Sequence, residues 1–401
     1  MIEVGFLGIG QGGNNAVETA SAFNYPCAIM NTSLGDLNAV KLIQQKDKYL
    51  IGSRGGCGKN RKTAISEVKL HHKGIIQFVK EKFVLNAKVA IKIVFVVFTG
   101  GGGTGSGMGP IITDLLNKSI NGILFIPIIL GPDFTESEGA LKNTILATKE
   151  IAAQSIPFTI ISNEKARKLH PNFTRKELFN FVNRELIKEL NQIFKTERTE
   201  TKTGNFDKQD FTTVINTAGM FLIHRTNLFL KEEKNEVLYA DMMKEVINDL
   251  DTSIYADLPY DKAVGYLGFL YTIPERKQTE IKYDEVRNIL GFPKEIFEGI
   301  YDFDEEKDEP NVVTIISGLS LPITQINEMA DIINGNMGER KRRNVSLDID
   351  LLEDDDDDLN VKKEVTFSSI LDEPDEFEGS DGEDVIEEED VDLGDFFAQY
   401  E

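Results

Sequence analysis

The segment that most constrains the fold of this chain is the run Gly101-Gly102-Gly103-Thr104-Gly105-Ser106-Gly107. It follows an apolar, strand-like segment, Ile91 to Phe98, and precedes an apparent helix, Pro110 to Lys118. The glycines leave backbone N–H groups uncovered, and the following helix directs the positive end of its dipole toward them. A flexible linker would have a similar composition, but linkers rarely join a buried strand to a helix. The run therefore predicts an anion-binding loop for phosphate groups.

Strand-like and helical segments alternate along the first part of the chain. Strands are expected at Ile2 to Ile9, Cys27 to Asn31, Ile91 to Thr99, Gly122 to Leu130 and Phe158 to Ser162. The helices expected between them cover Asn14 to Phe23, Lys62 to Phe83, Pro110 to Lys118 and Glu138 to Ser155. This alternation predicts an α/β fold with a parallel, Rossmann-like sheet and helices on both of its faces. In such sheets ligands bind at the carboxyl ends of the strands, where the loops gather.

A smaller α/β domain is expected after a long central helix, Arg175 to Thr196, which carries an apolar stripe. Its strands are expected at Val214 to Ile223, Ala263 to Tyr271 and Val312 to Ser317, and its last helix at Ile323 to Ile333. The predicted organisation is a first domain over 1–174, the central helix over 175–197, a C-terminal domain over 198–339 and a tail over 340–401.

The net charge of −23 comes almost entirely from that tail. Residues 344–401 contain 24 acidic and 2 basic residues, whereas the rest of the chain contains 43 acidic and 42 basic residues. A segment this acidic cannot bury a core, so the tail is expected to be disordered. Leu393, Phe396, Phe397 and Tyr400 have the spacing of one helix face, which predicts a terminal docking motif. The neutral body and the acidic tail argue against direct binding of nucleic acid.

Composition disfavours several other classes of protein. The chain has no apolar run of membrane length and no signal-peptide pattern, so a cytoplasmic protein without membrane binding is expected. Cys27 and Cys57 are its two cysteines, and its four histidines are scattered apart from the pair His71-His72. These residues support neither a disulfide framework nor a metal site built from protein side chains.

Two other glycine-rich segments match common nucleotide motifs only in part. Gly8-Ile9-Gly10-Gln11-Gly12-Gly13 fits the dinucleotide pattern, but the next strand ends Met30-Asn31-Thr32-Ser33, without the acid that would bind a ribose. Gly55-Gly56-Cys57-Gly58-Lys59-Asn60 lacks the first glycine and the Ser or Thr of a P-loop. The first pattern alone favours a nicotinamide-dependent oxidoreductase. Three converging loops suit a nucleoside triphosphate with its Mg²⁺, because its charge demands many donors.

Together the loops closely resemble those of the tubulin/FtsZ superfamily, over roughly residues 2–333. The signature of that superfamily is matched by Gly101, Gly102, Gly103, Thr104, Gly105, Ser106 and Gly107. The resemblance implies that this loop binds GTP or GDP, with Mg²⁺, together with three segments around it. The residues of those segments are Gly10, Gln11, Gly12, Gly13, Asn14 and Asn15; Asn31 and Thr32; and Gly55, Gly56 and Gly58.

The resemblance also implies contacts to the base and the sugar. Asn163 matches an asparagine that contacts guanine, while Phe179 and Asn183, one helical turn apart, match an aromatic that stacks on the base and an amide that reads its edge. Packing in the core is the alternative role for Phe179. Glu138 resembles the acid that binds the ribose, and Asp133 lies in the same loop.

The catalytic residues implied by the resemblance lie after the central helix. Asn205, Asp207 and Asp210 match the N-x-D-x-x-D synergy loop. In this family the synergy loop of the next subunit closes over the γ-phosphate, so Asp207 and Asp210 would position the attacking water in trans. The implied protein is therefore a GTPase whose active site is completed between subunits that assemble head to tail into filaments.

Within the superfamily the chain looks most like the plasmid- and phage-borne TubZ group. The similarity is carried by Val214-Ile215-Asn216-Thr217, Ser317 to Pro322 and Gly56-Cys57-Gly58-Lys59. That group implies a filament whose turnover moves plasmid or phage DNA through a DNA-binding adaptor protein at a centromere. The alternatives are an FtsZ-like cytoskeletal GTPase of cell division or phage positioning, and a nucleotide-binding scaffold that does not hydrolyse GTP.

Overall fold

The computed structural model of this chain describes residues 3–52, 55–194, 206–228, 240–258, 264–273, 287–288, 290–301 and 309–335. Contacts between residues group Met1–Ile333 into one compact unit and Asn334–Glu401 into another. The acidic run and the docking motif at Leu393, Phe396, Phe397 and Tyr400 lie outside the described residues, so both stay predictions. The domain boundaries expected from the sequence also stay predictions.

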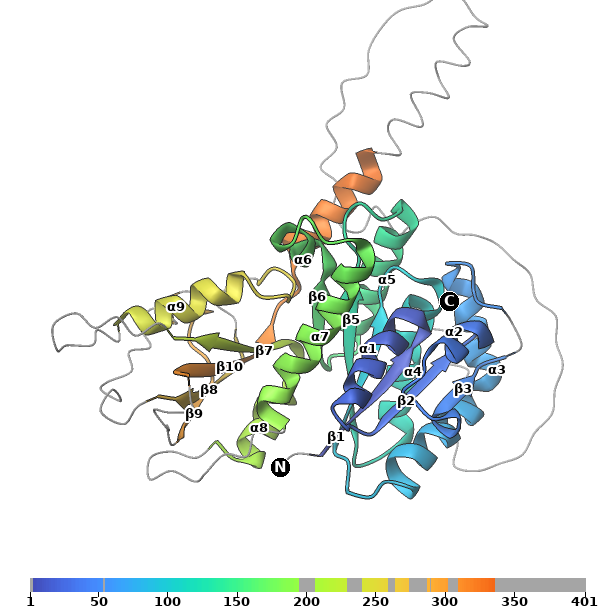
Figure 1. The fold of residues 1–401 in the computed structure, drawn as a ribbon, viewed down its shortest axis with the longest axis horizontal. Helices are drawn as coiled ribbons and strands as arrows, with labels where there is room; N and C mark the ends of the chain where they lie inside the picture. Colours follow the sequence, from blue (N-terminus) through green and yellow to red (C-terminus); the bar gives the residue numbers. More distant parts are fainter. Residues whose placement is uncertain are drawn as a thin grey trace, which may run out of the picture. The chain divides into compact units, whose positions relative to one another are not determined.

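A ten-stranded sheet runs through the described part of the first unit, in the order β3-β2-β1-β4-β5-β6-β7-β10-β8-β9 (Figure 1). Its strands are β1 (Val4–Ile9), β2 (Cys27–Asn31), β3 (Lys48–Leu50), β4 (Ile93–Thr99), β5 (Leu124–Gly131), β6 (Pro157–Ser162), β7 (Gly219–Asn227), β8 (Tyr266–Thr272), β9 (Glu295–Tyr301) and β10 (Asn311–Leu319). Every pair from β3 to β7 is parallel, whereas β10 is antiparallel to both β7 and β8. The predicted α/β class with a mainly parallel sheet is confirmed.

Helices follow most of the parallel strands. The α-helices of the described residues are α1 (Gly10–Ala22), α2 (Leu34–Ala39), α3 (Arg61–Lys80), α4 (Gly103–Ser119), α5 (Glu138–Ala153), α6 (Asn163–Leu169), α7 (Arg175–Phe194), α8 (Lys208–Ile215), α9 (Ala240–Asp251) and a helix over 323–335. None of the helices in the described residues is both long and apolar enough to cross a membrane. Strand β1 is buried at every position, as a sheet covered on both faces requires.

The strand order reverses between β1 and β4, and this reversal positions the site. From β1 the chain proceeds outward to β2 and β3, and from β4 it proceeds in the opposite direction to β5 and β6. Because parallel crossovers are right-handed, the helices that follow β1 and β4 lie on opposite faces of the sheet. The carboxyl ends of these two strands therefore flank a crevice, which is where ligands bind in open α/β sheets.

The expected strand Val214 to Ile223 is wrong in its first half. Helix α8 continues to Ile215, and β7 begins only at Gly219. The helix persists because Asp207 and Asp210 form a capping box that fixes its first turn. Strand β7 begins at Gly219, where glycine is required because φ is +109° and a Cβ would lie 2.8 Å from the Leu319 carbonyl oxygen.

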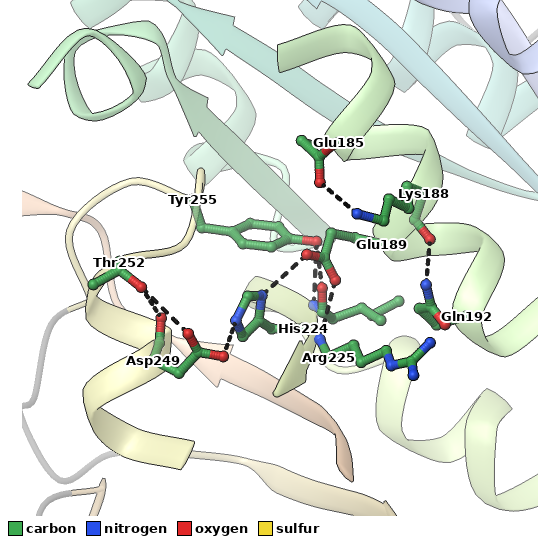
Figure 2. Close-up of polar contacts among 10 residues, drawn as sticks. Glu185, Lys188, Glu189, Gln192, His224, Arg225, Asp249, Thr252 and Tyr255 are labelled. Atoms are coloured by element: carbon green, nitrogen blue, oxygen red, sulfur yellow. Dashed lines mark hydrogen bonds and ion pairs between the residues drawn. The ribbon is translucent and has the colours of Figure 1, made fainter. Parts of the chain in front are cut away.

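A buried histidine ties the central helix α7 to the second half of the sheet (Figure 2). His224 of β7 faces two carboxylates: Nδ1 lies 3.1 Å from Glu189 Oε1 on α7, and Nε2 lies 3.0 Å from Asp249 Oδ2 on α9. Burial alone would lower the pKa of His224, but the hydrogen bonds to Asp249 and Glu189 outweigh it and raise the pKa to about 9. The imidazolium form is therefore the one that holds the three elements together.

We expect this histidine to make the stability of the fold depend on pH. Its contribution is complete below its ordinary pKa of about 6.5 and is lost as the pH rises through 9, a difference on the order of 3 kcal/mol. Denaturant unfolding of the wild type and of His224→Gln between pH 6 and pH 10 measures it. The stability difference between the two should shrink across this range. A stability difference that stays constant from pH 6 to pH 10 would contradict the role assigned to His224.

Candidate functional site

Two helices begin side by side at the reversal point of the sheet. Helix α1 starts at Gly10, directly after β1, and α4 starts at Gly103, soon after β4 ends at Thr99. A Cβ on Gly10, whose φ is +73°, would lie only 3.0 Å from the backbone nitrogen of Gly105. The first turns of both helices therefore present bare N–H groups to the same space, where the helix dipoles favour an anion.

The glycine run is helical over more of its length than the sequence suggested. Helix α4 includes Gly103 to Gly107, seven residues before the expected start at Pro110. Close packing explains these glycines, because a Cβ on Gly107 would meet the Ala64 Cβ at 2.7 Å and one on Gly109 would meet the Phe98 ring at 2.5 Å. The run thus serves both as the start of a helix and as its packing surface.

A third glycine segment, residues 55–60, closes over the start of α4. Lys59 has a left-handed backbone with φ +64°, and a Cβ on Gly103 would lie 2.6 Å from the Lys59 Cα. The Asn143 amide of α5 donates to the Lys59 carbonyl oxygen at 3.1 Å, and the Lys59 ammonium donates to Ser137 Oγ at 3.1 Å. These contacts place a lysine next to the exposed N–H groups of α4.

These segments surround a cavity of about 630 Å³, a size typical of small-ligand sites. Of the residues expected to bind a nucleotide, the following line it: Gln11, Gly12, Asn15, Gly56, Gly58, Gly101, Gly102, Gly103, Thr104, Gly105, Asn163, Phe179 and Asn183. The sequence thus anticipated a set of residues that the fold brings together from five separate segments. Their roles in binding stay predictions.

Other expected binding residues lie near the cavity without lining it. These are Gly10, Gly13, Asn14, Asn31, Thr32, Gly55, Ser106, Gly107, Asp133 and Glu138. Several have a packing or supporting role instead. A Cβ on Gly13 would meet the Val97 carbonyl oxygen at 2.1 Å, the Thr32 hydroxyl lies 3.1 Å from that of Thr104, and the Ser106 hydroxyl donates to the Gly102 carbonyl oxygen.

The far end of the cavity is aromatic and charged. Phe179 and Asn183 lie one turn apart on α7, and Asn163 begins α6 directly after β6. The guanidinium of Arg175 lies 5.5 Å from the centre of the Phe179 ring and forms an ion pair with Glu136, with Nη2 and Oε2 3.0 Å apart. Burial raises the pKa of the Glu136 carboxyl, and the charge of Arg175 offsets part of that rise.

Sequence reasoning missed several residues that line the cavity: Asp36, Cys57, Lys59, Thr99, Leu130, Gly131, Pro132, Glu136 and Arg175. Two of them carried a signal. Lys59 ends a glycine segment that matches a P-loop only in part, and Arg175 stands four residues before Phe179 on the same helix face. Leu130, Gly131 and Pro132 at the end of β5 carried no local signal, because the register of the sheet determines which residues reach the cavity.

The acids expected to be catalytic lie at the other end of the strands. Asp207 Oδ1 accepts hydrogen bonds from the backbone N–H groups of Gln209 and Asp210, at 2.7 and 2.9 Å, and so caps α8. Helix α8 borders a second cavity, of about 1100 Å³, together with Glu3, Lys92 and Ile156, which precede β1, β4 and β6. The first cavity lies at the carboxyl ends of the same strands, so about 20 Å of sheet separates the acids from it. Asn205 lies outside the described residues.

The sequence of this chain is similar to those of known proteins. Residues 3–171 match the Tubulin/FtsZ family, GTPase domain. The Tubulin-like protein TubZ of Clostridium botulinum C phage is 24% identical over 410 residues, covering 98% of each chain. The Tubulin-like protein CetZ of Pyrococcus abyssi is 25% identical over 324 residues, covering 78% of this chain and 84% of its own.

The fold is also shared with a solved structure. A crystal structure of a GTPγS-form protofilament of Bacillus thuringiensis serovar israelensis TubZ superposes with a TM-score of 0.73 at 15% identity, covering 86% of this chain and 94% of that one. The family match spans β1 to β6, and with them every glycine segment of the first cavity.

Proposed function

Because residues 3–171 match the GTPase domain of the Tubulin/FtsZ family, we propose that this protein is a filament-forming GTPase of the TubZ type. The observation that carries the proposal is the meeting of three glycine segments with Phe179 and Asn183 in one cavity. Guanine would occupy the end near Phe179, and the phosphates would occupy the end formed by α1 and α4.

The phosphate end suits a highly charged ligand. The first turns of α1 and α4 offer backbone N–H groups without intervening side chains, and Lys59 adds a positive charge. Mg²⁺ would neutralise part of the phosphate charge. It would be held mainly by phosphate oxygens and water, because the described residues contain no group of three acidic, histidine or cysteine side chains placed to hold a metal ion.

The base end predicts selectivity for guanine nucleotides. Phe179→Ala should weaken GTP binding about tenfold or more, because stacking of a base on an aromatic ring is lost. Phe292→Ala, at an exposed phenylalanine that does not line the cavity, is the matched control and should bind GTP as the wild type does. Calorimetric titration with GTP, ATP and NAD gives the affinities. Equal binding of ATP, or binding of NAD alone, would contradict a GTPase and would favour the oxidoreductase alternative.

Hydrolysis in this proposal requires a second copy of the chain. The capping acids of α8 lie about 20 Å from the cavity of their own chain, at the opposite ends of the strands. Stacking two copies head to tail would bring α8 of one copy onto the cavity of the next, where Asp207 and Asp210 could position water. Such a contact does not close on itself, so it generates filaments. The Bacillus thuringiensis TubZ structure, which is a protofilament, supports this arrangement.

The proposal also concerns the cargo that the filament would move. The similarity to the phage TubZ protein over 98% of the chain favours transport of plasmid or phage DNA through an adaptor protein. The similarity to CetZ favours a cytoskeletal GTPase of another kind. The two alternatives can be distinguished by forming filaments with GTP in material from cells of the native host and identifying the proteins that pellet with them. A DNA-binding protein that pellets with the filaments only when GTP is present supports the DNA cargo, and its absence from the pellet supports the alternative.

A further inference from the structure

Basic residues are concentrated in one part of the body of the chain. Residues 41–92 contain 13 Lys and Arg but only 3 Asp and Glu, although residues 1–343 as a whole contain 43 acidic and 42 basic residues. Helix α3 lies within this basic segment. The near-neutral total, which argued against binding of nucleic acid, therefore averages over a strongly basic region and a more acidic remainder.

Four lysines form a stripe along α3, which we call the lysine stripe: Lys62, Lys69, Lys73 and Lys80. Their spacing of 7, 4 and 7 residues keeps them within about 40° of one another around the helix axis, over a length of about 27 Å. The apolar residues that α3 buries lie on the opposite side of the helix: Ala64, Val68, Ile75 and Val79. The lysine stripe thus faces away from the core, with Lys62 and Lys73 exposed.

The three acids of residues 41–92 do not break the line of positive charge. Glu67 is 5% exposed, and its Oε2 lies 3.5 Å from His71 Nε2. Asp47 forms an ion pair with Lys82, with Oδ1 and Nζ 2.8 Å apart. Glu81 lies beyond the end of the stripe, in the turn that follows α3. A ligand laid along α3 therefore meets lysines over the whole length of the helix.

A straight line of single positive charges suits the phosphate backbone of a nucleic acid duplex. Each strand of double-stranded DNA carries one phosphate per ~3.4 Å of helix axis, so the lysine stripe is as long as about eight base pairs. The ammonium group of lysine contacts a phosphate as a point charge and carries no information about the base. The expected contact is therefore independent of base sequence.

Two other kinds of anionic partner fit the lysine stripe less well. Binding to a membrane surface requires a large apolar area beside the lysines. Between Lys62 and Lys80 one large apolar side chain, Leu70, is strongly exposed, at 75%. An acidic polypeptide has no fixed spacing of its charges, so a regular line of lysines gives it no advantage.

We propose that the lysine stripe of α3 binds double-stranded DNA through its phosphates, without preference for base sequence. The net charge of the chain does not decide such a contact, because at 0.1 M salt a ligand responds mainly to charges within about 10 Å. The contact goes beyond the function proposed above, since it requires neither GTP nor an adaptor protein. None of the four lysines lines the nucleotide cavity, so the two sites can be changed independently.

Titration of a fluorescent duplex of about 30 base pairs with the full chain, without nucleotide, tests the proposal by anisotropy. The affinity should fall steeply as salt is added. A plot of the logarithm of the association constant against that of the salt concentration should have a slope of about −3 to −4, the value for four phosphate contacts. Two duplexes of unrelated sequence should bind alike.

Charge reversal at two positions locates the contact on α3. Lys73→Glu combined with Lys80→Glu should weaken DNA binding at least about tenfold, and it should reduce the steepness of the salt dependence by about two. Lys73→Arg combined with Lys80→Arg keeps both charges and should bind as the wild type does. Lys142→Glu combined with Lys149→Glu is the matched control, because these lysines are exposed, lie seven residues apart on α5 and give the same change in net charge.

The outcomes decide between a site on α3 and a general effect of charge. Loss of DNA binding in the reversed α3 variant alone, with thermal unfolding and GTP affinity unchanged, supports the proposal. If that variant does not fold, the single variants Lys73→Gln and Lys80→Gln should each reduce the steepness by about one. A wild type that binds no DNA at about 50 mM salt overturns the proposal, as does an equal loss in the α5 control. Poly-glutamate or phosphatidylserine vesicles that bind as tightly as DNA would also overturn it.

Discussion

Gly103→Ala is expected to reduce the affinity for GTP about a hundredfold, which corresponds to the loss of roughly two charge-assisted hydrogen bonds. The new methyl group would lie 2.6 Å from the Cα and 2.7 Å from the carbonyl carbon of Lys59. Backbone atoms cannot rotate away as a side-chain end can, so residues 55–60 must shift outward. Lys59 and the start of α4 both line the cavity, and this shift would move them apart. Equilibrium binding of a fluorescent GTP analogue measures the effect.

Gly139→Ala is the matched control for this substitution. Gly139 also lies in the first turn of a helix that borders the site, but a Cβ there would meet no atom within 4 Å. Its affinity for GTP should remain that of the wild type. Thermal unfolding of both variants separates a local effect from a loss of folding. GTP affinity that survives Gly103→Ala in a folded protein would show that the phosphates do not bind at the start of α4.

Asp207→Asn is expected to lower GTP turnover at least ~100-fold while leaving GTP binding and filament formation intact. Asparagine is as good an N-cap as aspartate, so its side-chain oxygen can still accept from Gln209 and Asp210 and α8 should persist. The substitution thus removes the negative charge and little else. Phosphate release per subunit, measured beside sedimentation of filaments, gives both quantities.

Gln209→Ala serves as the control at the same turn of α8. Its side chain is exposed and takes no part in the capping box, so turnover should change little. If Asp207→Asn hydrolyses GTP as fast as the wild type in filaments of normal length, the acid has only a capping role and the water is positioned by another group.

The sheet and the glycine segments could be predicted because their signals are local. Apolar runs that alternate with helical segments indicated the strands β1, β2, β4, β5 and β6, and the reversal between β1 and β4 brings the glycine segments together. The start of α4 at Gly103 could not be predicted, because glycine disfavours helices in isolation. Only the close approach of Lys59 to Gly103 and of Ala64 to Gly107 shows why glycine is used at these positions.

Interactions between distant segments were beyond the reach of sequence patterns. The ion pair of Glu136 with Arg175 joins two separate segments of the chain, and no sequence motif links the two residues. The same is true of His224, which is a scattered histidine in the sequence and lies between carboxylates of α7 and α9 in the fold. In both cases the partner is set by tertiary packing, so only the folded chain reveals the pairing.

The most direct test of the central claim is GTP turnover per subunit as a function of protein concentration. A site completed by the acids of a neighbouring copy predicts almost no turnover in dilute protein. Turnover should rise steeply at the concentration where filaments first sediment. Addition of Asp207→Asn subunits that still bind GTP should lower turnover within mixed filaments. Turnover per subunit that stays constant down to concentrations without filaments would contradict the account, because each chain would then hold a complete active site.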